Sequence, residues 1–371
     1  MRDRGSPKPL RGQAWAARYD SFTRSDHPAM HPADKAVLKL ACGLGLATLL
    51  AYGLALKLPF VVCLLAVVLL TKPGPPIPLL KGLLTAVILA GLVAIGVFMV
   101  PLLENYPVSG VVLTGAILYG LFFFGLSTGN PLTLLLVIAF TLIPVAGVAD
   151  QLLIPMVSLS LAAGIAVGTL VGSLWHAFFP DPPGPARQAK APPAITREAA
   201  SWIALRAALI VLPVFVLALT DPSFYLAAIL KTVALGQQAC ATNARSAGRE
   251  LVGSTLMGAA MAAVLWAGLS MWPNLWILML WMSAAGLWAG ARMFGVRATR
   301  FRPSFWANAL TTMLILLGPA IEDSASGKDV LEASAVRVCL FVGVALYAWT
   351  TVWALERWRA RRSGALFFDR G

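Results

Sequence analysis

Charged residues are scarce in this chain of 371 residues, where 12% are Asp, Glu, Lys or Arg and 59% are hydrophobic. A soluble domain carries about 25% charged residues. Long apolar runs separate the few polar stretches, which excludes an ordinary soluble globular domain. The sequence predicts an all-α integral membrane protein, because helices let such runs cross a bilayer with every backbone group bonded.

Motifs of the common soluble enzymes are also missing. No HExxH or GxxxxGK[ST] motif occurs, no GxGxxG or GxSxG motif follows a predicted strand, and no pair of carboxylates lies within an apolar run. The four cysteines form no CxxC pair and the histidines number three, so neither a disulfide framework nor a metal site is expected. We expect no enzyme activity, no catalytic residue and no cofactor, and a membrane enzyme with an unfamiliar site remains the open alternative.

The net charge of +13 has two explanations, a nucleic-acid partner or the excess of basic residues in cytoplasmic loops. The loops favour the second. If both termini lie in the cytoplasm, the predicted outer loops contain only Lys57 and Lys328 as basic residues, and acids gather there. We therefore expect a multi-pass protein with both termini cytoplasmic, a lipid bilayer around it and no nucleic acid.

Twelve apolar segments are expected in two parallel six-helix repeats, related by an axis along the membrane normal. The first repeat covers residues 36–179 and the second 201–355, with a basic cytoplasmic arm at 1–35, a proline-rich cytoplasmic linker at 180–200 and a basic cytoplasmic tail at 356–371. Five spans per half is the alternative, if the short second helices do not cross. The expected segments are 36–56, 60–70, 79–103, 108–126, a fifth from 130 interrupted at Pro144, 152–179, 201–219, 224–235, 248–271, 274–293, 304–321 and 330–355.

Two of these segments are too short to span a bilayer, which takes about 20 helical residues. Residues 60–70 lead into a KPGPP break at 72–76, and residues 224–235 lead into the polar sequence GQQ at 236–238. A helix that ends inside the membrane leaves backbone groups that need protein or water as partners. Broken helices of this kind are typical of substrate sites in transporters. The sequence therefore predicts a transport site around these two segments.

Small residues and repeated positions support this organisation. Gly164, Gly168 and Gly172 form a GxxxGxxxG face, which predicts that another helix approaches the sixth segment closely. Positions at similar offsets in the two halves pair Lys39 with Arg206, Lys81 with Arg249, Pro131 with Pro303 and Pro144 with Pro319.

Basic residues are the candidates for binding a substrate. Several lie inside or at the ends of apolar segments, where ionisable side chains usually face a cavity or a partner. Each one alone also fits a long side chain that reaches the interface. The repeated pairs favour a basic inner vestibule, which suits an anion. The predicted anion path comprises Lys39, Lys72, Lys81, Arg206, Lys231 and Arg249.

An energy source for transport is harder to find. No nucleotide-binding motif is present, so the proton gradient is the natural candidate, yet no acid lies in the middle of a segment. A proton carrier should be a membrane-embedded acid or histidine. The candidates lie near segment ends and also fit ordinary loop charge. They are Asp150, Asp221, Glu322, Asp323 and His176.

Parts of the chain resemble the fusaric acid resistance and aromatic acid exporter superfamily, and more closely its short bacterial branch of uncharacterised membrane proteins. The resemblance covers residues 36–179 and rests on the KPGPP break and GNPLTLLLVIAFTLIPVAG. It extends to the second half through ATNARSAGRELVGSTLMGAAMAA. It implies a bacterial inner-membrane efflux component that works with a periplasmic adaptor protein of the membrane-fusion type, and kinship with plant malate channels. The long exporters carry large cytoplasmic domains after each membrane half, whereas the linker and the tail after Leu355 are short in this sequence.

Three functions follow as hypotheses. The first is a proton-driven exporter of organic or aromatic anions. The second is a passive organic-anion channel, and the third is a non-transporting membrane subunit of a secretion complex. The substrate and the coupling ion are left open by the sequence, as is homo-oligomerisation.

Overall fold

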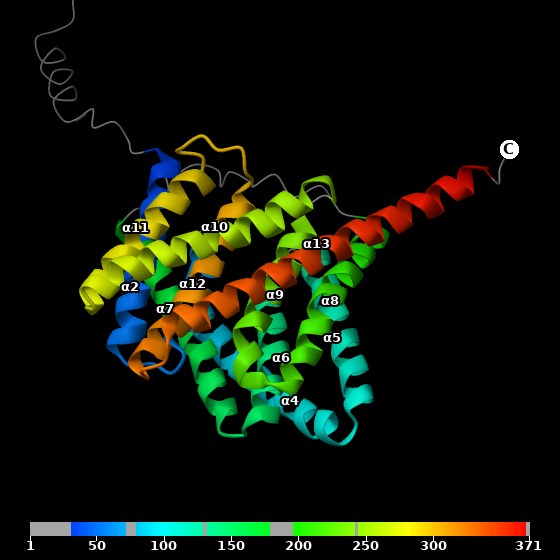
Figure 1. Ribbon diagram of the computed structural model, residues 1–371, viewed down its shortest axis with the longest axis horizontal. Helices are drawn as coiled ribbons and strands as arrows, with labels where there is room; N and C mark the ends of the chain where they lie inside the picture. Colours follow the sequence, from blue (N-terminus) through cyan, green and yellow to red (C-terminus); the bar gives the residue numbers. More distant parts are fainter. Residues whose placement is uncertain (1–30, 72–78, 129–131, 179–195, 242–243, 369–371) are drawn as a thin grey trace, which may run out of the picture.

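The computed structural model describes residues 31–71, 79–128, 132–178, 196–241 and 244–368, and these form helices and no strand (Figure 1). The fold is all-α, as predicted. The KPGPP break with Lys72, most of the basic arm and most of the linker lie outside the described residues. The helices are α2 (Pro32–Gly53), α3 (Pro59–Leu70), α4 (Leu79–Asn105), α5 (Pro107–Thr128), α6 (Leu132–Ala149), α7 (Leu153–Phe178), α8 (Arg197–Thr220), α9 (Pro222–Ala241), α10 (Ala244–Met271), α11 (Leu275–Met293), α12 (Pro303–Ala325) and α13 (Val330–Phe368).

Eight helices are long and apolar enough to cross a membrane, as judged by length and composition over the described residues. They are α2, α5, α7, α8, α10, α11, α12 and α13. Proline opens several helices, for example α3 at Pro59 and α12 at Pro303, because the first turn does not use its amide hydrogen. The protein is therefore a multi-span membrane protein.

The pairing of helices repeats between the halves. In the first half, α2 packs on α3, both α3 and α4 pack on α7, and both α4 and α5 pack on α6. The second half has the same pairs at equivalent positions: α8 packs on α9, both α9 and α10 pack on α13, and both α10 and α11 pack on α12. The contacts between halves are also equivalent, since α2 packs on α11 as α8 packs on α5, and α3 on α12 as α9 on α6. This pattern is what two copies of one six-helix unit would produce.

The short helix α3 lies inside the protein. Its residues from Phe60 to Val67 are all buried, and it packs against α2, α7 and α12. A helix that is hydrophobic all round is expected to be buried. At 12 residues it rises roughly 18 Å, which is too short for the hydrocarbon core. The sequence prediction that this segment does not face lipid is confirmed.

The glycine face of α7 receives α3. A Cβ atom added to Gly168 would lie 2.7 Å from the side chain of Leu69 and 3.2 Å from the Cα atom of Ala66. Gly164 lies against Leu65 in the same way. The predicted close approach of a second helix is thus confirmed, and the helix is α3.

Two predicted interruptions are wrong. Pro144 lies inside the continuous helix α6, with buried neighbours on both sides. Within a membrane bundle a proline is tolerated when packed neighbours surround the altered turn. The second-half segment at 224–235 does not stop at Gly236 either, because α9 continues to Ala241. Glutamine is a good helix former, and buried Gln238 also has hydrogen-bond partners outside its own helix.

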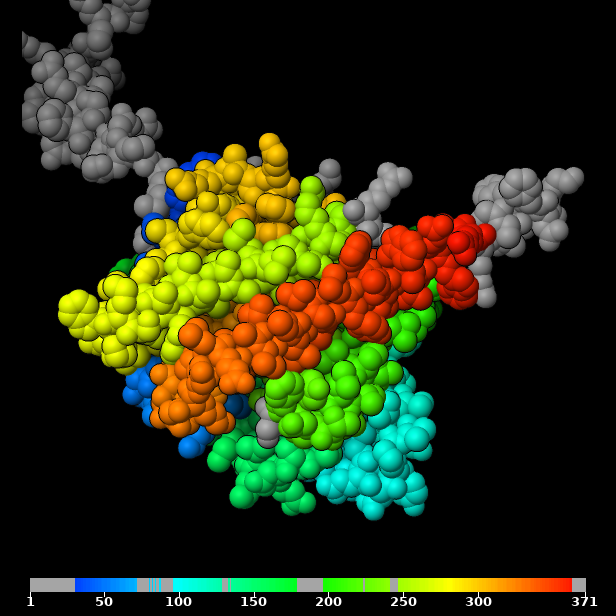
Figure 2. All heavy atoms as spheres, viewed as in Figure 1, coloured from blue at the N-terminus to red at the C-terminus, as the bar shows by residue number. Residues whose placement is uncertain are grey.

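The two halves differ in how their second helix is held. Among the described residues, α9 contacts α10 and α12 of its own half, whereas α3 contacts neither α4 nor α6. Figures 1 and 2 show α10 and α13 side by side across one face, with the far end of α13 extending beyond the body. The extra contacts of α9 enclose the polar cluster described next.

Candidate functional site

Lys231 lies at the centre of the second half, near the middle of α9. Its side chain is 0% exposed, which makes it one of the largest fully buried side chains of the described protein. The Nζ atom donates to Oγ1 of Thr312 at 2.6 Å and to Oδ1 of Asn308 at 3.3 Å. Both acceptors lie on α12, one helical turn apart. Lys231 therefore joins α9 to α12 through neutral groups.

Hydrogen bonds extend this cluster to α10. The Asn308 Nδ2 atom donates to Oγ of Ser254 at 2.6 Å, and the Ser254 hydroxyl donates to the carbonyl oxygen of Glu250. Nε2 of Gln238 on α9 donates to the same carbonyl at 3.2 Å. We call Lys231, Gln238, Ser254, Asn308 and Thr312 the polar cluster. It supplies the bonds that hold α9 against α10 and α12.

The cluster connects to the protein surface at one side. The Glu250 side chain is 3% exposed, and its Oε1 atom lies 3.5 Å from Nε of Arg302, which is 49% exposed. Arg302 is the residue before α12, at the end of the helix that the topology predicts to be cytoplasmic. Polar groups therefore run from this surface to the buried lysine.

No carboxylate pairs with Lys231 among the described residues. Within the part of the chain that the structure describes, its hydrogen-bond partners are the amide oxygen of Asn308 and the hydroxyl of Thr312. Burying a charge is strongly unfavourable unless it is paired and hydrogen-bonded. In a membrane bundle a buried ionisable residue marks a functional site by default. The cluster can therefore hold an anion beside Lys231 or hold the lysine as a neutral amine.

The other predicted cations do not join Lys231. Nζ of Lys39 lies 3.4 Å from Nδ1 of His176, which links α2 to α7. Arg249 is exposed, with its guanidinium 5.8 Å from the ring centre of Phe301. Lys72 and the side chain of Lys81 lie outside the described residues. The structure thus distributes the described cations over separate places.

Arg206 joins α8 to α9 and α13. It is 4% exposed, and its Nη1 atom donates to Oε1 of Glu356 at 2.8 Å. Nη2 donates to the carbonyl oxygen of Ala239 on α9, and Nε1 of Trp202 also donates to Glu356, at 3.3 Å. Its repeat partner Lys39 lies on α2, and α2 makes no contact with α8 within the described helices. A single basic vestibule containing both residues is therefore not seen.

The acids predicted to carry protons lie at helix ends. Asp150 and Asp221 are exposed, and each accepts a hydrogen bond from a nearby backbone amide, of Leu152 at 2.8 Å and of Phe224 at 3.1 Å. These are the local bonds with which aspartate caps a turn.

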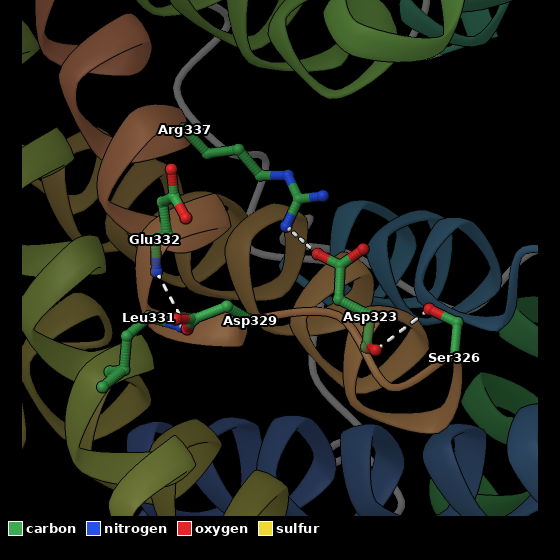
Figure 3. A network of polar contacts seen from close by, with 6 residues as sticks. All are labelled: Asp323, Ser326, Asp329, Leu331, Glu332 and Arg337. Atoms are coloured by element: carbon green, nitrogen blue, oxygen red, sulfur yellow. Dashed lines mark hydrogen bonds and ion pairs between the residues drawn. The ribbon is translucent and has the colours of Figure 1, made fainter.

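The two acids at the end of α12 differ in their surroundings. Glu322 is exposed. Asp323 is buried, and its Oδ2 atom accepts a hydrogen bond from Nη1 of Arg337 on α13 at 2.5 Å (Figure 3). The carboxylate at this position therefore already has a cationic partner.

Two cavities lie away from the cluster. One, of about 400 Å³, lies between α5, α8 and α13. It is lined by Tyr119, Ser201, Trp202 and Arg359, among others. The other, of about 490 Å³, lies between α2, α10, α11 and α12 and is lined by Tyr52 and Trp266 among others. Both are large enough for a small organic molecule. Neither is lined by Lys231, whose side chain is fully buried, so the cluster is closed to solvent in this structure.

Sequence reasoning named Lys231 but missed Glu250, Ser254, Asn308 and Thr312. The available signal was the spacing, because Glu250 and Ser254, like Asn308 and Thr312, are four residues apart. Residues four apart share one helix face. Which helix each face meets could not be read from that spacing.

Residues 36–174 match an uncharacterised family. Its model is described as a protein of unknown function, DUF2955. No curated protein and no solved structure matches the chain. The match covers the first repeat only, whereas the polar cluster lies in the second. Nothing in it names the exporter superfamily, which stays a resemblance.

Proposed function

We propose that this protein exports organic anions, aromatic acids among them, across the bacterial inner membrane together with a periplasmic adaptor protein, and is not an enzyme. The observation that carries this proposal is Lys231, a fully buried lysine in a membrane bundle whose partners among the described residues are neutral. A carboxylate reaching it would replace Asn308 or Thr312 and supply the missing charge. The repeated helix pairing adds support, since transporters are often built from such repeats.

The surroundings of the cluster fit an anion better than a cation. Its groups include the donors Nζ of Lys231, Nδ2 of Asn308 and Nε2 of Gln238, and Arg302 stands at the surface end. Glu250 faces Arg302 at that end rather than Lys231. An anion would thus meet Arg302 at the surface end and Lys231 inside, while the Glu250 carboxylate between them faces Arg302.

A passive anion channel is the second candidate. It is favoured by one observation, that each described acid on the predicted proton route is either exposed or, like Asp323, paired with a base. A monovalent anion leaving a cell that is negative inside gains about 2.3 kcal/mol per 100 mV, so export needs no further energy source.

Anion efflux from liposomes tests the proposal. Purified protein in liposomes loaded with radiolabelled benzoate or benzenesulfonate is expected to release anion faster than protein-free liposomes. Lys231→Met should lose at least about tenfold of the protein-dependent rate, because removing one charge-assisted hydrogen bond costs roughly 1.5–3 kcal/mol. The exposed Lys57→Met is the matched control and should keep the wild-type rate.

Two results would contradict the proposal. Wild-type protein without flux of either anion would favour a non-transporting membrane subunit. Equal flux in wild type and Lys231→Met would place the anion path elsewhere. In cells, deletion of the gene should lower tolerance to aromatic acids, and only variants with flux should restore it.

A further inference from the structure

The number of acceptors around Nζ of Lys231 can be compared with the number of N–H groups that the side chain has in each protonation state. A lysine ammonium has three N–H donors, and a neutral amine has two. Nζ has two acceptors here, Oδ1 of Asn308 and Oγ1 of Thr312. The Thr312 hydroxyl uses its single hydrogen on the carbonyl oxygen of Asn308 at 2.6 Å, so it accepts from Nζ rather than donating to it. The closed cluster satisfies both hydrogens of a neutral amine and would leave a third hydrogen without an acceptor.

The orientation of Asn308 is fixed independently. Its Nδ2 atom donates to Oγ of Ser254 at 2.6 Å, and that hydroxyl gives its own hydrogen to the carbonyl oxygen of Glu250. The amide oxygen of Asn308 must therefore face Lys231. Reversing the amide would place two donors, Nδ2 and Nζ, against each other at the Lys231 end and two acceptors against each other at the Ser254 end.

Charged groups on the surrounding helices do not compensate a charge on Lys231. The helix α6 has no titratable residue, and Arg206 of α8 faces Glu356 of α13. On α10 the Glu250 carboxylate faces Arg302, while on α12 Asp323 faces Arg337 of α13. None of these forms an ion pair with Lys231 among the described residues. None of the described residues therefore balances a charge on its amine, and an anion that enters the cluster would do so.

We propose that Lys231 couples anion transport to protons, taking up one proton together with each anion and releasing both on the other side. This rests on the proposed function. When the bundle opens to one side, the lone pair of Nζ takes a proton from water, and the third N–H donates to the bound anion. On the far side the anion leaves, the proton returns to water, and neutral Nζ bonds again to Asn308 and Thr312. No other group changes its proton.

The sign of this coupling differs from the one expected from the sequence. A proton gradient that drives export requires protons to move inward as the anion leaves. Here the proton and a monovalent anion move in the same direction in a ratio of one to one, so each cycle moves no net charge. Export then runs down the outward concentration gradient of the anion itself, and an inward proton gradient opposes it.

Proton movement during benzenesulfonate efflux tests the proposal. This anion stays ionised at neutral pH, so it does not leak through lipid as the free acid. Liposomes containing wild-type protein, benzenesulfonate and a pH-sensitive dye should become alkaline inside as the anion leaves, with one proton lost per anion. An imposed potential of 100 mV should not shift the final distribution, whereas movement of the anion alone would shift it about 50-fold.

Lys231→Arg separates the two roles of the residue. An arginine keeps its charge under all these conditions and can still face the anion. Efflux through this variant should proceed without alkalinisation and should become sensitive to the membrane potential. Lys57→Met again serves as the control, and thermal unfolding in detergent checks that each variant is folded.

Each outcome is decisive. Alkalinisation in wild type that is lost in Lys231→Arg supports the coupling. Efflux with no change of internal pH, or with acidification, overturns it while leaving the proposed export function intact. Absence of efflux for benzenesulfonate and benzoate overturns both.

Discussion

Replacing Glu356 with leucine is expected to lower the free energy of unfolding by about 3–5 kcal/mol, because it removes the carboxylate that faces a buried guanidinium. Arg206 is 4% exposed and donates to Glu356 at 2.8 Å. Trp202 donates to the same oxygen, so its indole N–H also loses an acceptor. Leucine has a similar volume but accepts no hydrogen bond. Unfolding of the purified protein in detergent by increasing amounts of SDS measures the change.

The reverse substitution is the matched comparison. Arg206→Met leaves the carboxylate of Glu356 instead, and this side chain is 32% exposed, so water compensates part of the loss. We expect a smaller decrease, of about 1–3 kcal/mol. The double variant should recover most of the stability, because replacing both partners by apolar groups is often nearly neutral. If Glu356→Leu unfolds as the wild type does, the ion pair does not hold α13 against α8.

Gly318→Ala is expected to lower stability by about 1–3 kcal/mol by forcing apart two central helices. A Cβ atom at this position of α12 would overlap Cβ of Phe60 on α3 and come within 2.9 Å of its Cδ1 atom. The Cβ atom of Phe60 is fixed by its backbone and cannot rotate away. The helices must therefore separate, and α3 is buried on every side. The same SDS titration measures the effect.

Gly343→Ala is the control for helix propensity. Nothing lies within 4 Å of a Cβ atom at Gly343, which is an exposed position of α13. Alanine favours helix over glycine by up to about 1 kcal/mol, so this variant should equal or exceed the wild type. A loss at Gly343 as large as that at Gly318 would mean that contact with Phe60 is not the cause.

The positions of the helices follow from local sequence patterns, whereas the continuity of a helix depends on its packing. Apolar run lengths located most described helices within a few residues, for example 108–126 against Pro107–Thr128, whereas α9 and α13 run on to Ala241 and Phe368, well past the predicted ends at 235 and 355. They did so because a bilayer sets the length of an apolar segment and leaves few alternatives. The interruptions at Pro144 and Gly236 failed for the opposite reason. Whether a helix is interrupted at a residue of low helix propensity, such as proline or glycine, depends on the side chains that pack around it. Those side chains come from distant parts of the chain.

At the site too, the sequence pattern selected candidate residues, and the packing of the helices decided which partners they have. An unusual charge in an apolar helix singled out Lys231, yet the same rule also selected Arg206 and Lys39, which have partners of their own. The difference lies in the helix packed opposite each residue. Lys231 meets Asn308 and Thr312, whereas Arg206 meets Glu356, which lies 150 residues further along the chain.

The sequence by itself determined that this is a helical membrane protein with a short buried second helix, and it predicted the two repeats with which the helix pairing agrees. Apolar length and residue spacing act locally, so they can be read along the chain. Only the tertiary structure decided that α9 is held against α10 and α12 while α3 is not held against their equivalents in the described helices. It also decided that Lys231 lies inside that contact with Asn308 and Thr312, and with no carboxylate of the described residues, as its partners. Such contacts join residues far apart in sequence, and the side chains that meet are fixed by how the helices pack.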